Sequence, residues 1–214
     1  MHPGLLSREF FQQDPRDAAV RLIGAELLWH GAAGRIVEVE AYETTGDEAS
    51  HTFFRPTTRG FVAKYPPGTA YVYLNYGMHW LFNVLVKGPS AEGFVLVRAL
   101  EPTLGIEEMR LRRGRERSRD LCSGPGKLTQ ALGITGEAHG TDLCDDIGRG
   151  LRLPAERILP ERILVDVRIG ITKAADFPWR YLLAGSDCLS VRPTKAAHPL
   201  SPFSQSKIRN PNPQ

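Results

Sequence analysis

Apolar and polar residues alternate in several short stretches of this chain, a pattern typical of half-buried β-strands. In residues 162–171, isoleucine and valine occupy nearly every second position. Residues 71–86 hold two apolar, aromatic-rich runs on either side of Asn75-Tyr76-Gly77. Asn and Gly accept the positive φ angles of a tight turn, so this stretch predicts a buried hairpin with Tyr76 at its apex.

Further strands are predicted at residues 27–30 and 35–42, joined by a glycine-rich turn, at residues 94–100, and within residues 179–192. In the strand at 35–42, alternation places Glu38, Glu40 and Tyr42 on one face. The apolar run at 94–100 contains Arg98. A buried guanidinium group needs acceptors, so Arg98 predicts a carboxylate or another polar partner.

Helix-start signals stand at Ser7 and at Asp14-Pro15, so the N-terminal part is predicted to be helical. A second helical region begins near Thr103, and residues 123–127 open a short helix that Gly133 ends. Between these regions, residues 43–68 have the composition of an unusually long loop, and long loops are commonly functional.

The chain has 214 residues, of which 42% are hydrophobic, and this is enough for one sizeable core. Lys and Arg number 27 against 24 for Asp and Glu, a mildly basic balance that permits an anionic partner. The sequence shows neither a signal-peptide pattern nor an apolar run of membrane-spanning length, so we expect a cytoplasmic protein. The three cysteines are far apart and are expected to be reduced and buried.

Two groups of polar residues resemble known kinds of binding site, a metal site and a phosphate-binding loop, but neither has the expected spacing. Glu38, Glu40, Asp47 and His51 are metal-ligand types, but their spacing does not match a zinc-binding helix. Residues 123–127, Ser-Gly-Pro-Gly-Lys, lack the spacing of a nucleotide-binding loop, yet a helix N-terminus with a lysine can hold a DNA phosphate.

The basic run at residues 110–119 is either a solvated helix end or a phosphate contact. A further interpretation joins a carboxylate base to an aromatic pocket. Glu38 or Glu40 can activate a water that Arg98 orients, and Tyr42 and Tyr73 can stack on a planar ring. The alternative is that these carboxylates are solvated and the tyrosines belong to the core.

Six motifs follow one another along the chain: RIVEVEAY at 35–42, DEASH at 47–51, PG at 67–68 with YVY at 71–73, YGM at 76–78 with Asn83, VRALEP at 97–102, and LCSGPGKL at 121–128. In this order they closely resemble the alkyladenine (3-methyladenine) DNA glycosylases of the mammalian type, a family that also has bacterial members. The resemblance runs from about residue 5 to residue 192.

The resemblance implies a monofunctional glycosylase of base excision repair. Such an enzyme flips alkylated or deaminated purines, such as 3-methyladenine, hypoxanthine and ethenoadenine, out of double-stranded DNA and hydrolyses the N-glycosidic bond. It implies no metal and no cofactor, a monomer, and action in the bacterial cytoplasm at the nucleoid. A noncatalytic lesion-binding protein and a bifunctional glycosylase/lyase using Lys127 are the alternatives.

Matched by position, the resemblance implies Glu40 as general base, with Arg98 and the backbone carbonyl of Ile169 placing the attacking water. The implied base pocket consists of Tyr42, His51, Tyr73 and Asn83. The implied DNA-binding residues are the wedge Tyr76, with Met78, Lys127 and Arg59. Three features depart from the family pattern, namely Asn75 before the wedge, Gly60 after Arg59, and a short segment between His51 and Arg59.

The expected fold class is α/β (α+β). We expect a single compact glycosylase domain at residues 1–192, with a curved, mainly antiparallel sheet, a protruding β-hairpin and surrounding helices. Residues 193–214 are rich in Pro, Ser and Asn and are expected to form a mobile tail.

Overall fold

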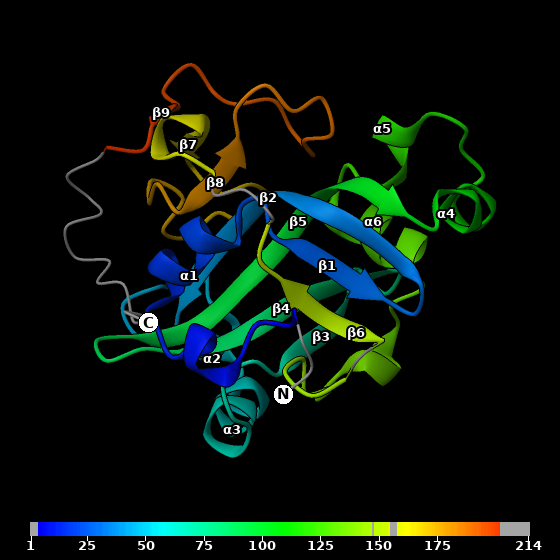
Figure 1. The fold of residues 1–214 in the computed structure, drawn as a ribbon. Coiled ribbons are helices and arrows are strands. Elements are labelled where there is room, and N and C mark those ends of the chain that lie inside the picture. Colours follow the sequence, from blue (N-terminus) through cyan, green and yellow to red (C-terminus); the bar gives the residue numbers. More distant parts are fainter. Residues whose placement is uncertain (1–3, 147, 155–157, 202–214) are drawn as a thin grey trace.

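A single antiparallel sheet is the centre of the computed structural model, which describes residues 4–146, 148–154 and 158–201 (Figure 1). In this part of the chain nine strands form the sheet, with the order β3-β4-β5-β2-β8-β7-β9, and β1 pairs with β2 and β6. The strands are β1 (Glu26–Trp29), β2 (Ala32–Glu43), β3 (Ala70–Asn75), β4 (His79–Lys87), β5 (Glu92–Leu104), β6 (Arg149–Arg152), β7 (Ile163–Asp166), β8 (Arg180–Leu183) and β9 (His198–Pro199). The expected mixed fold with a mainly antiparallel sheet is confirmed.

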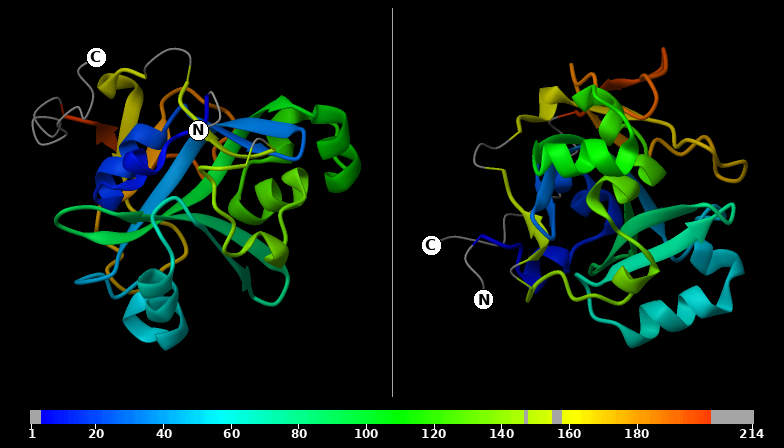
Figure 2. Two further views of the ribbon diagram at one scale, coloured as in Figure 1. Left: turned by 60° about the horizontal axis from the view of Figure 1, so that its bottom comes forward. Right: turned by 90° about the vertical axis from the view of Figure 1, so that its right-hand side faces the viewer.

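Helices surround this sheet (Figures 1 and 2). The α-helices are α1 (Pro15–Leu22), α2 (His51–Phe54), α3 (Pro56–Lys64), α4 (Ile106–Arg113), α5 (Ser118–Leu121) and α6 (Pro125–Leu132). The 3₁₀ turns are η1 (Arg8–Phe11), η2 (Gly136–Ala138) and η3 (Pro160–Arg162). Asp14-Pro15 starts α1, and Gly133 ends α6 at a φ of 74°. Both boundaries match the sequence signals.

Strand β2 lies in the middle of the sheet. It pairs with β5 along most of its length on one side, and with β1 and then β8 on the other. The β2–β5 register shifts on both sides of Glu38, which marks an irregularity there. Strand β2 is paired on both sides, and its glutamates, Glu38 and Glu40, bind buried arginines and backbone N–H groups. Neither glutamate has any exposed surface.

Alternation along β3, β4 and β5 separates two cores. The larger core takes Val72, Val84 and Val97 from these strands, together with residues of α1 and α6. The smaller core, an aromatic cluster on the opposite face, contains Tyr71 and Phe94 from the strands and is covered by α3. On each of these strands, the polar residues of the site stand at every second position, in step with the residues of the aromatic cluster. The two-residue period of a strand therefore brings them to the same face.

The prediction of one long loop at residues 43–68 is wrong, because this segment contains α2 and α3. Pro56 takes the first helical position of α3, where a missing N–H costs nothing. Phe61 and Val62 then anchor the helix in the aromatic cluster. The helices therefore depend on tertiary packing rather than on strong local propensity.

The strand predicted for residues 162–171 ends early, at Asp166. Gly170 has a φ of +76°, and Arg168 turns inward to bind Asp47. Residues 167–171 leave the sheet for these reasons, and they pass over the end of β2.

The first residues of the predicted tail, 193–201, make contacts with the sheet. Thr194 bonds to Asp166 through its N–H (2.8 Å) and hydroxyl (2.6 Å), β9 pairs with β7, and Leu200 is buried. Residues 193–201 thus pack on the domain, and the rest of the predicted tail, 202–214, lies outside the described residues.

The hairpin of β3 and β4 has its turn where the sequence placed it, and its tip reaches the edge of the molecule (Figure 2). The N–H of Met78 donates to the Asn75 carbonyl at 3.1 Å. Positive φ angles occur at Tyr76 (50°) and Gly77 (70°), not at Asn75 as the sequence suggested. Such a pair of angles is typical of a type I′ hairpin turn, and a bulky residue adopts it rarely. Tyr76 is 84% exposed.

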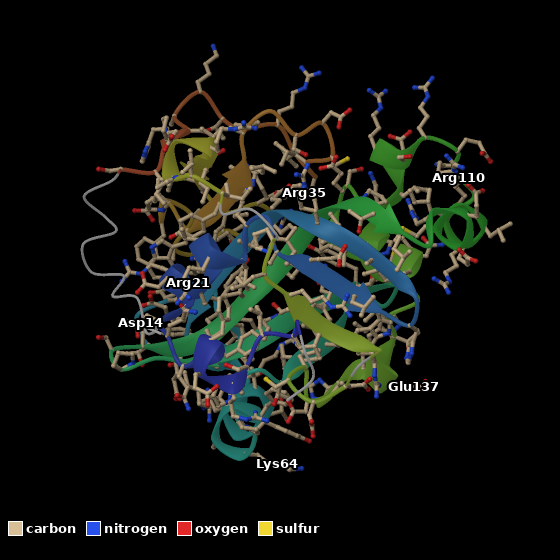
Figure 3. All side chains as sticks on the ribbon, viewed as in Figure 1. Asp14, Arg21, Arg35, Lys64, Arg110 and Glu137 are labelled. Atoms are coloured by element: carbon tan, nitrogen blue, oxygen red, sulfur yellow. The ribbon has the colours of Figure 1, made fainter. Side chains whose placement is uncertain are left out.

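The basic run has a largely structural use. Arg110, at the periphery on α4 (Figure 3), pairs with Glu107 and donates to the Glu116 carbonyl. Arg112 donates to Ala131 O (2.9 Å) and Arg113 to Leu121 O (3.1 Å). These arginines therefore fasten α4 to α6 and α5.

The cysteines Cys122, Cys144 and Cys188 are free, as expected, but Cys144 is only half-buried. In the part of the chain that the structure describes, no helix has the length and apolar character needed to cross a membrane.

Candidate active site

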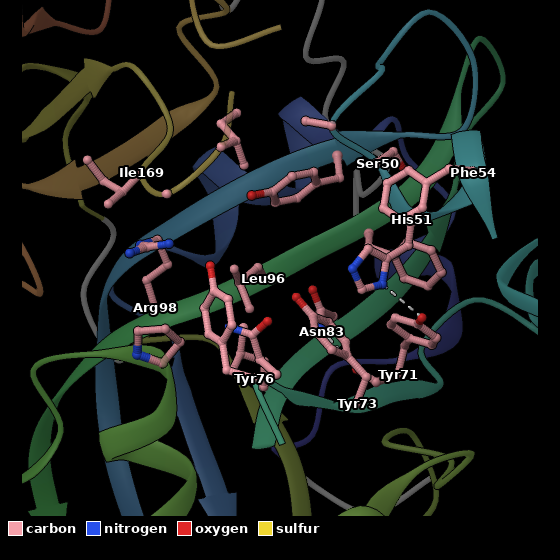
Figure 4. A pocket seen from close by; sticks show the side chains of 18 residues that line it. Ser50, His51, Phe54, Tyr71, Tyr73, Tyr76, Asn83, Leu96, Arg98 and Ile169 are labelled. Carbon is pink, nitrogen blue, oxygen red and sulfur yellow. Dashed lines mark hydrogen bonds between the residues drawn. The ribbon is translucent and has the colours of Figure 1, made fainter. Parts of the chain in front are cut away.

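A pocket of about 330 Å³ opens on the face of the sheet that carries the aromatic cluster (Figure 4). This volume lies in the usual range for small-molecule sites, about 300–1,000 Å³. Arg98 and Ile169 lie on one side of the pocket in the figure, and His51, Phe54 and Tyr71 on the other. The predicted site residues that line it are Tyr42, His51, Tyr73, Tyr76, Asn83, Arg98 and Ile169.

Glu40 is fully buried at one end of this pocket, among groups that do line it. Its Oε1 accepts a hydrogen bond from the backbone N–H of Ile169 at 2.7 Å. Its Oε2 accepts from the Tyr42 hydroxyl at 2.8 Å and from Arg98 Nη1 at 3.1 Å. A carboxylate has about four acceptor sites, so these donors from the described residues leave room for one more, such as a substrate water.

Arg98 joins the carboxylates of Glu38 and Glu40. This confirms the sequence prediction that an arginine in an apolar run has a carboxylate or another polar partner. Its Nε donates to Glu38 Oε1 and its Nη1 to Glu40 Oε2, both at 3.1 Å. Burial by itself lowers the pKa of Arg98, but the carboxylates of Glu40 and Glu38 raise it above its ordinary value. Arg98 therefore stays charged and fixes the plane in which Glu40 lies.

Tyr42 is held between the carboxylate and a second buried arginine. Burial, and then the Glu40 charge, raise the pKa of the Tyr42 phenol, so it remains a hydrogen-bond donor. The Arg168 guanidinium lies 4.6 Å from the centroid of the Tyr42 ring. Arg168 also binds both oxygens of Asp47, at 2.6 and 2.8 Å. This ion pair therefore fixes the aromatic wall and the segment leading to His51 together.

His51 faces Tyr73 across a centroid distance of 4.3 Å, with the rings tilted by 56°. Its Nδ1 lies 3.1 Å from the Tyr71 hydroxyl, which lies 2.9 Å from Thr58 Oγ1 (Figure 4). Burial and then the charge of Arg55 lower the pKa of His51 to about 4. The imidazole is therefore neutral at neutral pH.

This shift predicts an acid-sensitive part of the stability. Between pH about 6.5 and about 4 the unfolded chain binds a proton at His51 that the folded chain does not, so stability falls as pH decreases through this window. The variant His51→Asn is expected to lose less stability across it than the wild type. Urea unfolding at several pH values measures the difference, with His198→Asn, a substitution at an exposed site, as control. Parallel curves for wild type and His51→Asn would contradict the assignment.

Asn83 lines the pocket from β4 with a fixed orientation. Its Nδ2 donates to the Tyr71 carbonyl at 3.0 Å, and the residue is 4% exposed. The cross-strand pairing of Tyr71 and Asn83 places both on the pocket face.

The predicted DNA-contacting residues lie outside this enclosed region or at its edge. Met78 is 69% exposed beside Tyr76, and Lys127 is exposed near the start of α6. A Cβ on Gly126 would meet His79 at 2.9 Å, so this helix start packs against the hairpin next to its tip. Arg59 is exposed but donates to Thr52 O at 2.8 Å, which ties α3 to α2.

The residues of the metal-site alternative are occupied in other ways. Glu38 and Glu40 bind Arg98, and Asp47 binds Arg168. Among the described residues no group of three or more His, Cys, Asp or Glu side chains is arranged to hold a metal ion.

Sequence reasoning missed Arg168, Arg180, Ser190 and Phe54. Arg168 stands in an apolar run just as Arg98 does, so the same criterion of an embedded charge could have found it. Arg180 and Ser190 meet the site only through pairing across more than a hundred residues, for which the local sequence carries no signal.

Comparisons with known proteins show which family this chain resembles. The family model described as methylpurine-DNA glycosylase (MPG) matches residues 9–187. A relative from Rhodopseudomonas palustris, named as a candidate 3-methyladenine DNA glycosylase, is 50% identical over 192 residues and covers 88% of this chain and 91% of its own. Relatives with the same name from Nitrobacter winogradskyi and Rhizobium meliloti are 48% and 44% identical. They cover 90% and 89% of this chain, and 89% and 98% of their own.

Proposed function

Because this chain belongs to the methylpurine-DNA glycosylase family and is a DNA glycosylase of base excision repair, we propose that it flips alkylated or deaminated purines out of duplex DNA and hydrolyses their N-glycosidic bonds by a monofunctional mechanism. The proposed substrates are 3-methyladenine, hypoxanthine and ethenoadenine. The proposed form is a monomer acting at the bacterial nucleoid. The single observation that carries the chemistry is Glu40, buried beside an aromatic pocket with one acceptor site left for a water.

The proposed reaction uses Glu40 as general base. Water attacks the sugar C1′ as the C1′–N bond breaks, its proton passes to Glu40, and the bonding electrons leave with the base. The sugar becomes positively charged on the way, so the adjacent carboxylate also stabilises the transition state. Arg98, Tyr42 and the Ile169 N–H hold the carboxylate in place, and the Ile169 carbonyl is proposed as a further water ligand.

The pocket supports recognition of a planar ring. Tyr42, His51 and Tyr73 present aromatic faces, and a ring-methylated purine is cationic, so it stacks well on electron-rich tyrosines. We propose that Asn83, whose amide is fixed by Tyr71, crowds the exocyclic amino group of guanine. The hydrolytic rather than lyase reaction is favoured by Lys127, which is exposed and does not line the pocket.

The test is base release from duplexes that carry each lesion. After incubation, abasic sites are revealed as strand breaks on alkali treatment. We expect breaks only after alkali. Breaks without alkali would indicate a lyase, and lesion binding without any release would indicate a noncatalytic binding protein.

Tyr76 is proposed as the wedge that fills the gap left by the flipped nucleotide, with Met78 beside it in the minor groove, and with Lys127 and Arg59 on the DNA backbone. Tyr76→Ala is expected to weaken binding to lesion duplexes by about 10-fold or more, because base–aromatic stacking contributes about 1–3 kcal/mol. Release from a single-stranded lesion substrate should change little, because that base is already unstacked.

Filter binding and single-turnover release on both substrates measure this difference. The control is Leu74→Ala, an exposed apolar residue on the same hairpin that does not line the pocket. Equal losses on duplex and single-stranded substrates would argue against a wedge.

A further inference from the structure

Five buried charged residues form one continuous chain of ion pairs behind the pocket. Arg180 Nη1 lies 3.2 Å from Asp166, and Arg180 Nε lies 2.8 Å from Glu38. Arg98 then links Glu38 to Glu40 at 3.1 Å on each side. Glu38, Glu40 and Arg180 have no exposed surface at all.

Glu38, in the middle of the chain of ion pairs, accepts four hydrogen bonds. Its Oε1 accepts from Arg98, Arg180 and the Ser190 hydroxyl, the last at 2.7 Å, and its Oε2 accepts from the Ser190 N–H at 2.6 Å. Three of these four bonds fall on Oε1 and one on Oε2. Glu38 thus accepts one hydrogen bond more than Glu40, which accepts three from the described residues.

The bond between Glu38 and Arg98 fixes a geometry. A guanidinium group is planar with its donors in a rigid fork, so holding Nε also sets the direction of Nη1. Glu38 takes Nε and Glu40 takes Nη1. The position of Glu40 therefore depends, through Arg98, on Glu38 and on the groups that bind Glu38.

The chain also carries an excess charge. Its three carboxylates face two guanidinium groups, which leaves one negative charge in a buried region. Fixed charges act strongly where water is excluded. The carboxylate at one end of this chain, Glu40, lies beside the pocket in which the proposed reaction generates a positively charged sugar.

We infer that Glu38 is a positioning residue for base release, and that Ser190 and Arg180 hold it so that Arg98 orients Glu40. This inference rests on the proposed function. It assigns to the segment after β8 a part in catalysis, although Ser190 does not line the pocket.

The experiment compares Glu38→Gln with Asp166→Asn. Both substitutions neutralise one buried carboxylate that binds Arg180, so both perturb folding in a similar way, but only Glu38 contacts Arg98. Glu38→Gln is expected to slow single-turnover release from a hypoxanthine duplex by about 10²-fold, the usual effect of a misplacement near 1 Å. Asp166→Asn should slow it by less than about 5-fold, because a lost hydrogen bond at that distance acts weakly on Glu40.

Ser190→Ala provides a milder variant that leaves Glu38 charged and paired with both arginines. Its release rate should fall by about 5-fold. The dissociation constant for lesion DNA, measured by filter binding, should change less than about 2-fold in all three variants, because a positioning residue acts on the chemical step.

Release by Glu38→Gln within about 5-fold of wild type, or equal slowing by Glu38→Gln and Asp166→Asn, would overturn the inference and leave the proposed function standing. Loss of DNA binding in parallel with rate would also overturn it, since this would show a general structural role. Absence of base release by the wild type would overturn the proposed function itself.

Discussion

Glu40→Gln is expected to lower the single-turnover rate of base release by about 10³-fold while leaving lesion binding nearly unchanged. The amide keeps the shape of the carboxylate but cannot take a proton from water. It also places an NH₂ group toward either the Ile169 N–H or the pair formed by Tyr42 and Arg98, all of which are donors. The measurement is alkali-revealed cleavage of a hypoxanthine duplex with enzyme in excess.

Glu43→Gln is the matched control. Glu43 ends the same strand and carries an exposed ion pair with Arg16, outside the pocket. This control should release base at the wild-type rate. If Glu40→Gln kept more than about a tenth of the wild-type rate, general-base catalysis by this carboxylate would be refuted.

Arg98→Met is expected to damage both stability and chemistry. Removing one partner of a buried ion pair costs about 3–5 kcal/mol, because the remaining charge is left without compensation. Here two carboxylates, Glu38 and Glu40, lose their shared cation. The free energy of unfolding in urea should fall by about that amount, and base release should fall by about 10²-fold or more.

Arg98→Lys separates these two effects. An ammonium group retains the charge but lacks the planar fork, so it cannot hold both carboxylates in the same geometry. We expect this variant to recover part of the stability and little of the rate. Arg16→Met, which removes an exposed pair, should cost at most about 1 kcal/mol. Recovery of the full rate by lysine would show that the geometry of Arg98 is unimportant.

Local pattern was sufficient for the parts of the site that lie on regular strands. Period-two alternation placed Glu38, Glu40 and Tyr42 on one face, and the structure joins them through Arg98 and the Tyr42 hydroxyl. The hairpin tip and the helix ended by Gly133 likewise followed from residues with special backbone preferences.

The remaining parts of the fold and of the site depend on contacts between residues that are far apart in the sequence, so no short stretch of sequence reveals them. Asp47 and Arg168 are separated by 121 residues, and each needs the other to be buried. Residues 51–64 are polar enough to resemble a loop, and they become helical because Phe61 packs in the aromatic cluster. The early end of β7 also follows from Arg168 turning toward Asp47, which alternation could not reveal.

The chain of buried ion pairs has a consequence for the order in which the protein can become active. Glu38 must meet Arg180 and Ser190, which follow it by 142 and 152 residues. Contacts at such separations form late, after the entropy of closing a long loop has been overcome. During synthesis the N-terminal half therefore contains Glu38 without Arg180 and Ser190, and a competent catalytic centre arises only when β8 and the segment after it have left the ribosome. A nascent or truncated chain is accordingly expected to have no partial activity.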